Sequence, residues 1–170
     1  MIATGKGKLF SFFSNICFNG GFFKHFYNLR VVISKKLRYL NPMQIAITKD
    51  VKIVVETSYQ NSKVKNFSGQ HMFAYRITIL NQGDYTIKLL RRHWHIVDLI
   101  GGKSEVEGEG VVGLQPVLEP GESHQYVSGC SLVAEIGKMY GTYLMERQID
   151  GELFEVKIPE FTLGVPFIFN

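Results

Sequence analysis

The stretch RRHWHIVDLIGGKSEVEGEGVVGLQPVLEPGESHQYVSG, residues 91–129, decides the fold. It contains the only Trp of the chain, two His residues two positions apart, a Gly101-Gly102 pair, a G-x-G-x-x-G run at 108–113 and a Pro120-Gly121 pair. Glycine accepts positive φ and proline presets φ, so the Gly-Gly and Pro-Gly pairs mark tight turns between extended segments. The stretch therefore predicts strands joined by short turns, against which the flanking segments pack.

Alternation of apolar and polar residues continues on both sides of this stretch. After residue 43, no apolar face recurs at helical spacing over ten residues, whereas period-two patterns bounded by turn residues are frequent. Asp150-Gly151 is the strongest short-range hairpin signal. We therefore predict an all-β fold, an antiparallel β-sandwich of about seven to eight strands. The expected strands are 51–57, 71–80, 85–100, 103–110, 123–130, 139–149, 152–158 and 161–163.

Length and charge bound the class of protein. A chain of 170 residues with 45% hydrophobic and 20% charged residues fits one globular domain. Residues 1–42 hold seven Lys or Arg and no acid, a charge of +7, whereas the remaining residues hold 12 basic and 15 acidic side chains, a charge of −3. The net charge of +4 thus comes from the N-terminal segment, and we expect no nucleic-acid partner.

Residues 1–42 form a basic, aromatic-rich extension that differs in composition from residues 43–170. The extension lacks an 18-residue apolar run and a signal-peptide cleavage pattern, so we predict neither a membrane span nor secretion. Met43 is the expected true start, the extension being upstream sequence that we expect to be disordered; alternatively, residues 28–40 form a basic amphipathic turn on a membrane surface or a partner. Cys17 and Cys130 match no metal spacing, which favours a reducing, cytoplasmic setting.

The glycine run at 108–113 has two interpretations. In a dinucleotide fold, such glycines follow a strand and open a helix that holds a pyrophosphate, but no amphipathic helix follows here. A non-Rossmann loop could still contact a nucleotide polyphosphate through the backbone of Gly108, Gly110 and Gly113. Glutamates line the same stretch and would repel a bare phosphate, so this interpretation requires a divalent cation such as Mg²⁺ or Co²⁺. The alternative is structural: the glycines permit a bulge and a bend between sheets.

His93 and His95 flank Trp94 and, on a strand, project to one face, close enough to share a metal ion. A third and a fourth ligand would come from residues across the hairpin, and the spacing does not decide among several candidates. The alternative is a polar outer face with Trp94 in the core. The candidate further ligands are Glu105, Glu107, Asp98 and His124.

Nucleophilic and acid–base chemistry find no support in the sequence. Cys130 lacks a local base, and the adjacent Ser123 and His124 would point to opposite faces of a strand. We therefore predict that the protein is not an enzyme and needs no cofactor beyond a divalent cation.

Five motifs occur in order along the chain: FAYRITILNQG (73–83), RHWHIVD (92–98), GEGVVGLQPVLEPGE (108–122), YVSGC (126–130) and FEVKIPEFTL (154–163). Together they resemble the ApaG family, and the resemblance runs from about Met43 to Leu163. The resemblance implies a β-sandwich of the immunoglobulin or fibronectin type III kind, in a family linked to cobalt tolerance and magnesium efflux. The same domain in some eukaryotic F-box proteins and in a DNA-polymerase-delta-interacting protein looks like a protein-interaction module. The family's glycine signature, proposed to bind pyrophosphate-containing ligands, would fall on Gly108, Gly110 and Gly113.

The sequence thus predicts a cytoplasmic, non-enzymatic ApaG-type binding module that contacts a protein partner through an open sheet face or edge strand. The alternatives are a nucleotide-polyphosphate site that requires a divalent cation, and direct sensing of a divalent metal. A homodimer formed through an exposed sheet edge is a further expectation.

Overall fold

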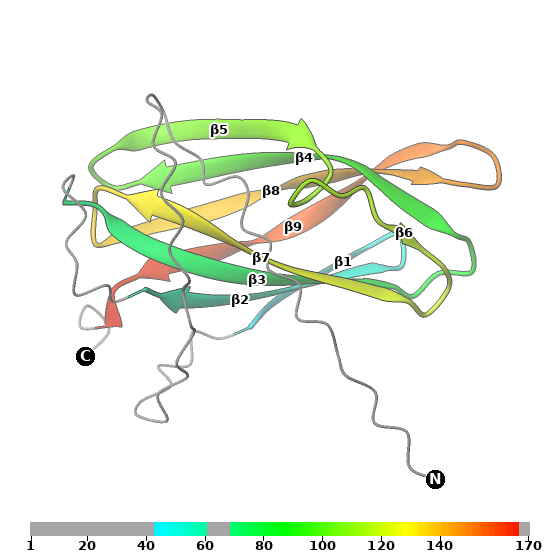
Figure 1. Ribbon diagram of the computed structural model, residues 1–170, viewed down its shortest axis with the longest axis horizontal. Coiled ribbons are helices and arrows are strands. Elements are labelled where there is room, and N and C mark those ends of the chain that lie inside the picture. The colour runs from blue at the N-terminus through cyan, green and yellow to red at the C-terminus, as the bar shows by residue number, and fades with distance from the viewer. Residues whose placement is uncertain (1–42, 61–68, 167–170) are drawn as a thin grey trace, which may run out of the picture.

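The computed structural model describes residues 43–60 and 69–166, which form two packed antiparallel sheets with no α-helix (Figure 1). One sheet has the strand order β1-β2-β3-β7 and the other β5-β4-β8-β9, with β6 pairing to β4. This arrangement confirms the predicted all-β sandwich. The strands are β1 (Gln44–Thr48), β2 (Val51–Tyr59), β3 (His71–Asn81), β4 (Ile87–Asp98), β5 (Gly102–Glu109), β6 (Val117–Leu118), β7 (Ser123–Leu132), β8 (Ile136–Arg147) and β9 (Leu153–Gly164).

Nine strands occur in the described residues, where seven or eight were expected. The additional ones are β1 and the two-residue β6. The expected strands 152–158 and 161–163 are one continuous strand, β9, which passes Pro159 through an irregularity: Met139 lies opposite Phe161, but Gly141 lies opposite Ile158. The extra residue on β9 is a bulge, the place where a sheet tolerates proline. Residues 1–42 and most of the expected 61–70 loop lie outside the described residues.

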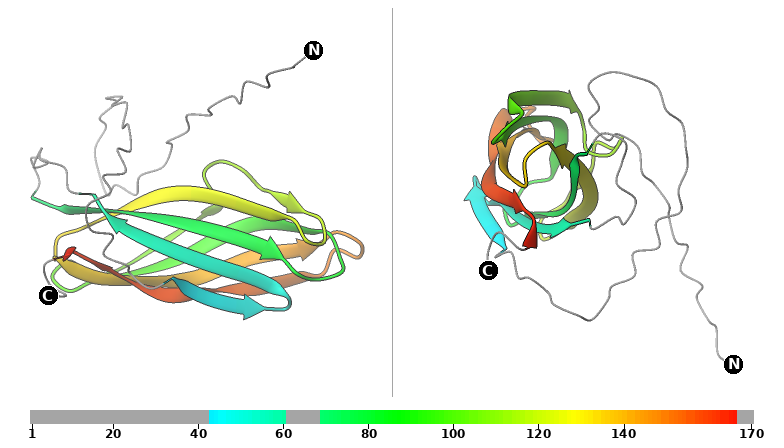
Figure 2. Two further views of the ribbon diagram at one scale, coloured as in Figure 1. Left: turned by 90° about the horizontal axis from the view of Figure 1, so that it is seen from below. Right: turned by 90° about the vertical axis from the view of Figure 1, so that its left-hand side faces the viewer.

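The core fills the space between the two sheets, which wrap around a common interior when viewed end-on (Figure 2). Trp94 lies at its centre, with the rings of Tyr75, Phe161 and Tyr143 at centroid distances of 5.6, 5.8 and 6.4 Å. Tyr75 belongs to one sheet and the other three residues to the other, so this cluster joins the two layers. Such tilted and edge-on aromatic contacts add to the free energy gained from apolar burial.

The two sheets also meet through a buried pair of hydroxyl groups. The hydroxyl oxygens of Tyr126 on β7 and Tyr143 on β8 lie 2.5 Å apart. The two residues are 8% and 0% exposed. Burial raises the pKa of both phenols well above the ordinary value of 10.0. Each hydroxyl therefore satisfies the other inside the apolar core.

Apart from the tyrosines, two polar side chains are buried among the described residues, and each organises one end of the sandwich. Asn81 donates from its side-chain amide to the carbonyls of Tyr85 and Leu118 and accepts from the amide of Gly83. Asp98 binds the turns at the opposite end. The connections between strands are therefore held by specific hydrogen bonds.

The hairpin turn at Asp150-Gly151 is longer than a two-residue turn. The strands end at Arg147 and resume at Leu153, and the amide of Arg147 donates to the carbonyl of Glu152 across a four-residue loop. Gly151 takes a φ of +72°. Arg147 binds Asp150 and Glu152 from one side and draws the pKa of Asp150 down to about 2.

No helix in the described part of the chain has the length and apolar character needed to cross a bilayer.

Candidate functional site

A bulge in β4 determines which side chains face outward. Leu89 pairs with Met145 of β8, but Arg91 pairs with the next residue, Leu144, so Leu90 is an extra residue on β4. Because side chains alternate between faces along a strand, one inserted residue exchanges the faces of everything beyond it.

The exchange is visible in the burial along β4. Before the bulge, the core residue is odd-numbered: Leu89 is 1% exposed. Beyond the bulge, the core residues are even-numbered: Trp94 and Ile96 are 2% and 7% exposed. His93 and His95 therefore lie on the outer face of the sheet. Without the bulge, the alternation that begins at Ile87 would carry both histidines into the core.

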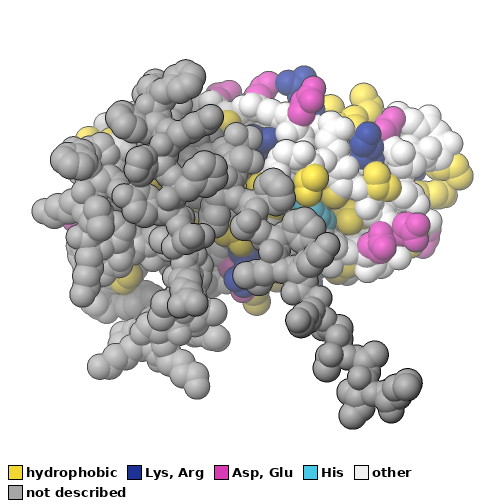
Figure 3. Space-filling view, viewed as in Figure 1, with side chains coloured by type: hydrophobic (Ala, Val, Ile, Leu, Met, Phe, Trp, Pro, Cys, Tyr) yellow, Lys and Arg dark blue, Asp and Glu magenta, His cyan; other side chains and the backbone are white. Residues whose placement is uncertain are grey.

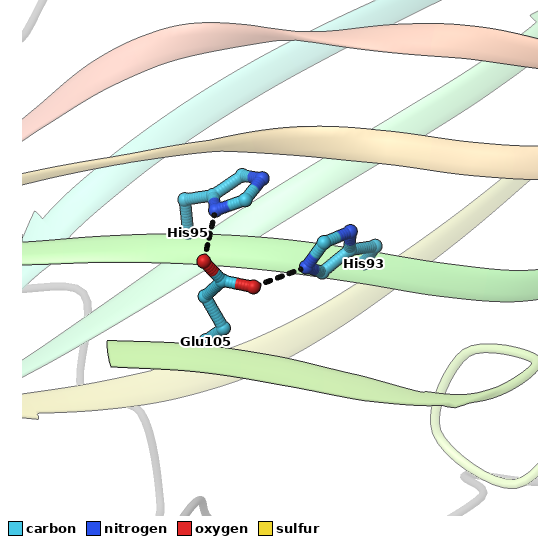
Figure 4. A group of neighbouring side chains, drawn as sticks. All are labelled: His93, His95 and Glu105. Atoms are coloured by element: carbon cyan, nitrogen blue, oxygen red, sulfur yellow. Dashed lines mark hydrogen bonds and ion pairs between the residues drawn. The ribbon is translucent and has the colours of Figure 1, made fainter. Parts of the chain in front are cut away.

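The two histidines meet Glu105 of the neighbouring strand β5 (Figure 4). His93 Nε2 lies 3.0 Å from one carboxylate oxygen of Glu105, and His95 Nδ1 lies 3.3 Å from the other. The imidazole rings are 4.4 Å apart, and the ring of Tyr140 on β8 stacks on His95 at 4.9 Å. The hydrogen bond from His93 is the main reason why the pKa of Glu105 lies below its ordinary value.

Of the other residues considered as metal ligands, only Glu107 lies near this group. One Glu107 oxygen is 3.7 Å from His93 Nε2, and the other is 3.7 Å from the Arg91 guanidinium. Figure 3 shows acidic and basic side chains next to one another along the upper edge of the molecule, over β5. Asp98 instead lies at the end of β4 on the core face, and His124 lies on β7 opposite Ile79 in the other sheet. The structure does not bring these two residues to the cluster.

The glycine run forms a tight turn after β5. Val111 and Leu114 exchange both backbone hydrogen bonds, at 2.8 and 3.0 Å, around Val112 and Gly113. These two residues have φ values of +50° and +77°, as in a type I′ hairpin turn. At Gly110, φ is +56° and a Cβ atom would lie 2.0 Å from the carbonyl oxygen of Leu114, so only glycine fits there.

Several backbone amides of the glycine run already have protein acceptors. Gly110 donates to the carbonyl of Leu90, Val111 donates to Leu114, and Leu114 donates to Val111. A phosphate cradle depends on amides that point at the ligand. Three amides of this segment instead hold the turn and attach it to the β4 bulge.

Arg92 lies beside the same run, on the opposite face of β4 from the histidines. Its guanidinium donates to the carbonyls of Glu109 and Gly110 at 2.9 and 2.8 Å. A Cβ atom at Gly108 would meet that guanidinium at 3.0 Å. Arg92 thus binds backbone carbonyls and fixes the end of β5, whereas Arg91 lies beside the carboxylate of Glu107.

Asp98 has a role that the sequence interpretation missed. Its carboxylate accepts four backbone hydrogen bonds, two from the β4–β5 turn and two from the β7–β8 turn, at 2.5 to 3.1 Å. Both turns expose apolar side chains: Leu99 is 76% exposed, Ile100 74% and Val133 46%. An aspartate at a strand end before a glycine turn is the sequence signal for such an Asx-type cap.

The fold and these sites define an all-β sandwich whose tight turns are fixed by short-range polar contacts. Residues 61–147 match the family model of the ApaG domain. The chain is 43% identical over 124 residues to Protein ApaG of Brucella abortus, covering 73% of this chain and 95% of that protein. It is 44% identical over 119 residues to Protein ApaG of Paramagnetospirillum magneticum, covering 70% and 91%. The protein belongs to the ApaG family.

A solved structure agrees with the family assignment. The crystal structure of a Bordetella pertussis protein described as ApaA superposes with a TM-score of 0.63 at 38% identity. The match covers 75% of this chain and 98% of that protein. The resemblance inferred from the five motifs is confirmed.

Proposed function

We propose that this protein is a non-enzymatic binding module that recognises an apolar segment of another protein with two adjacent turns, 99–101 and 133–135. The observation that carries the proposal is the exposure of Leu99, Ile100 and Val133 on turns that share one carboxylate, that of Asp98. Because both turns bind the same side chain, they lie next to each other at one end of the sandwich.

Three physical arguments support a recognition role for these two turns. Loops on a rigid β scaffold are common binding sites, because the scaffold fixes their position. Binding costs less free energy when the loop is ordered beforehand, and the four hydrogen bonds to Asp98 supply that order. Exposed apolar groups on such turns contribute little to the fold, which favours a role in contacting a partner.

The glycine run supports the alternative, a nucleotide-polyphosphate site, less well. The amides of Gly110 and Val111 have protein acceptors, and Glu105, Glu107 and Glu109 lie on the adjoining strand. Titration with ATP, with and without Mg²⁺, followed by amide NMR, tests this alternative. Shifts centred on residues 108–113 that require both components would support it over the protein-interaction module. The cytoplasmic setting and the homodimer stay predictions.

A site-specific photo-crosslinking experiment tests the proposal. Ile100 is replaced by benzoylphenylalanine in the full chain, and Ile149, 73% exposed on the β8–β9 loop, is replaced in a matched control. A protein crosslinked from position 100 is then purified and titrated with the unmodified chain. We expect Ile100→Ser to weaken that binding at least about tenfold and Ile149→Ser to leave it unchanged. Equal effects of the two substitutions would refute the assignment, and a crosslinked second copy would redirect it to self-association.

A further inference from the structure

We propose that His93, His95 and Glu105 bind a divalent transition-metal ion of the Zn²⁺, Ni²⁺ or Cu²⁺ class on the outer face of the β5-β4-β8-β9 sheet. This site is separate from the turns proposed to contact a protein, which lie beyond the ends of these strands. The inference rests on three donor atoms that the sheet brings together.

The donor geometry is that of a three-ligand site. One nitrogen of each imidazole and one carboxylate oxygen of Glu105 all lie within 4.8 Å of one another. Ligands bound to one ion at bond lengths of about 2.0–2.2 Å lie roughly 3–4 Å apart, so small side-chain rotations close the group around an ion. Glu105 lies directly opposite His95 in the strand register, so the backbone pairing holds these two ligands on neighbouring strands.

The surroundings limit the movement of the ligands. Tyr140 stacks on the ring of His95. Trp94, which stands between the two histidines in the sequence, is buried and fixes β4 to the core. The side chains of His93 and His95 are each 32% exposed, so an ion can reach them from solvent. Glu107 lies 3.7 Å from His93 Nε2 and offers a further oxygen near the same nitrogen.

The ligand types determine the class of ion. Two imidazoles and a carboxylate suit Zn²⁺, Ni²⁺ and Cu²⁺, whereas Mg²⁺ and Ca²⁺ prefer shells made of oxygen atoms. Three protein ligands leave at least one coordination position for water or for a group from another molecule. Because an ionised carboxylate only accepts hydrogen bonds, His93 Nε2 donates to Glu105 in the metal-free protein, and the ion takes the place of that proton.

Isothermal titration of the full chain with Zn²⁺ and with Ni²⁺ tests this site. We expect one equivalent to bind, with imidazole ¹⁵N shifts at His93 and His95 and a raised melting temperature, because an ion that binds only the folded state stabilises it. Each of His93→Gln, His95→Gln and Glu105→Gln should weaken binding by at least about tenfold, the smallest loss typical of even an outer-shell partner. Mg²⁺ at the same concentration should leave the imidazole signals unchanged.

Matched controls separate this site from adventitious binding. Glu109→Gln removes a carboxylate from the same face of β5, opposite Arg91, and His71→Gln removes an imidazole that contacts Tyr59; both should bind like the unmodified chain. Trp94 fluorescence checks that every variant is folded. Unchanged affinity in the three ligand variants, or no binding by the unmodified chain, would overturn the proposal. Equal binding of Mg²⁺ would overturn the assigned class of ion.

Discussion

The backbone amide of Gly110 donates a 2.9 Å hydrogen bond to the carbonyl of Leu90, the extra residue of the β4 bulge. The side-chain amide of Gln115 donates to the same carbonyl at 2.9 Å. At a bulge, a backbone group loses its hydrogen-bond partner on the neighbouring strand and must find another donor or acceptor. The glycine run supplies it, and so helps to maintain the insertion that places His93 and His95 on the outer face.

Substitution of Gly110 by Ala should therefore destabilise the fold strongly. The new Cβ would lie 2.0 Å from the Leu114 carbonyl oxygen, and the residue would keep a φ of +56°. We expect a loss of about 3 kcal/mol or more in the free energy of unfolding, measured with urea.

Two other glycines of the run serve as graded controls. Gly113 also has a positive φ, +77°, but open space around it, so Gly113→Ala should cost about 1–2 kcal/mol. Gly108→Ala would meet only the Arg92 guanidinium, at 3.0 Å, which would have to shift slightly against its two carbonyl acceptors, and should cost about 1 kcal/mol. Equal losses at all three positions would contradict the structural role of Gly110.

The sequence allowed the sheets to be predicted, but not the bulge. Period-two alternation and glycine turns are local signals, so the sequence alone predicts a hairpin at Gly101-Gly102 that places Glu105 across from the histidine strand. Leu90 itself carries no sequence signal for a bulge. The bulge is recorded only in which positions are buried, the odd-numbered Leu89 before it and the even-numbered Trp94 after it. The sequence does not predict β1, because its apolar residues Ile45 and Ile47 face solvent, at 50% and 60% exposure. The strand therefore departs from the pattern in which apolar residues face the core.

Residue type alone makes Asp98 a candidate metal ligand, but its carboxylate binds backbone amides. Whether a carboxylate meets histidines or backbone amides depends on the face and the strand end that it occupies. The pairing of two turns from distant parts of the chain, which contain Ile100 and Val133, is a tertiary feature. No local pattern records it.

Removing the Asp98 carboxylate should loosen both turns. One oxygen accepts from Ile100, Gly101 and Ala134, and the other accepts from Val133. Asp98→Ala leaves all four amides without this acceptor and should cost about 3 kcal/mol, whereas Asp98→Asn keeps one oxygen and should cost about 2 kcal/mol. Urea unfolding at neutral pH measures both values, and amide exchange at residues 99–101 and 133–135 should rise in the same order.

Acid should remove the contribution of Asp98 in the unmodified chain. Burial alone would raise the pKa of this carboxyl, but the amides of Gly101, Ile100, Val133 and Ala134 together hold it below the ordinary value of 3.8. The unfolded state therefore takes up the proton first, and the contribution is complete above that value and is lost as the pH falls through the folded pKa. The stability difference from Asp98→Asn should narrow as the pH falls below the ordinary value of 3.8; a constant difference would show that the charge is not responsible.

The exposed tips of the turns should be dispensable for folding. Ile100 is 74% exposed, so Ile100→Ser should change the free energy of unfolding by less than about 0.5 kcal/mol. Ile96, 7% exposed on β4 shortly before this turn, is the matched buried position, and Ile96→Ser should cost several times more. A large loss at Ile100 would mean that its exposure serves the fold, which would weaken its assignment to partner binding.

The hydroxyl pair of Tyr126 and Tyr143 should behave as one unit. Each single change to Phe leaves the other hydroxyl buried without this partner and should cost about 1–3 kcal/mol, whereas the double change removes both polar groups and should cost less than the sum. A double-mutant cycle in urea measures the coupling, and additive losses would contradict it. Because burial raises the pKa of both phenols, the folded state holds their protons more tightly than the unfolded state does. Their contribution should therefore be complete below the ordinary value of 10.0 and decline above it, and the double Phe variant should lack this alkaline decline.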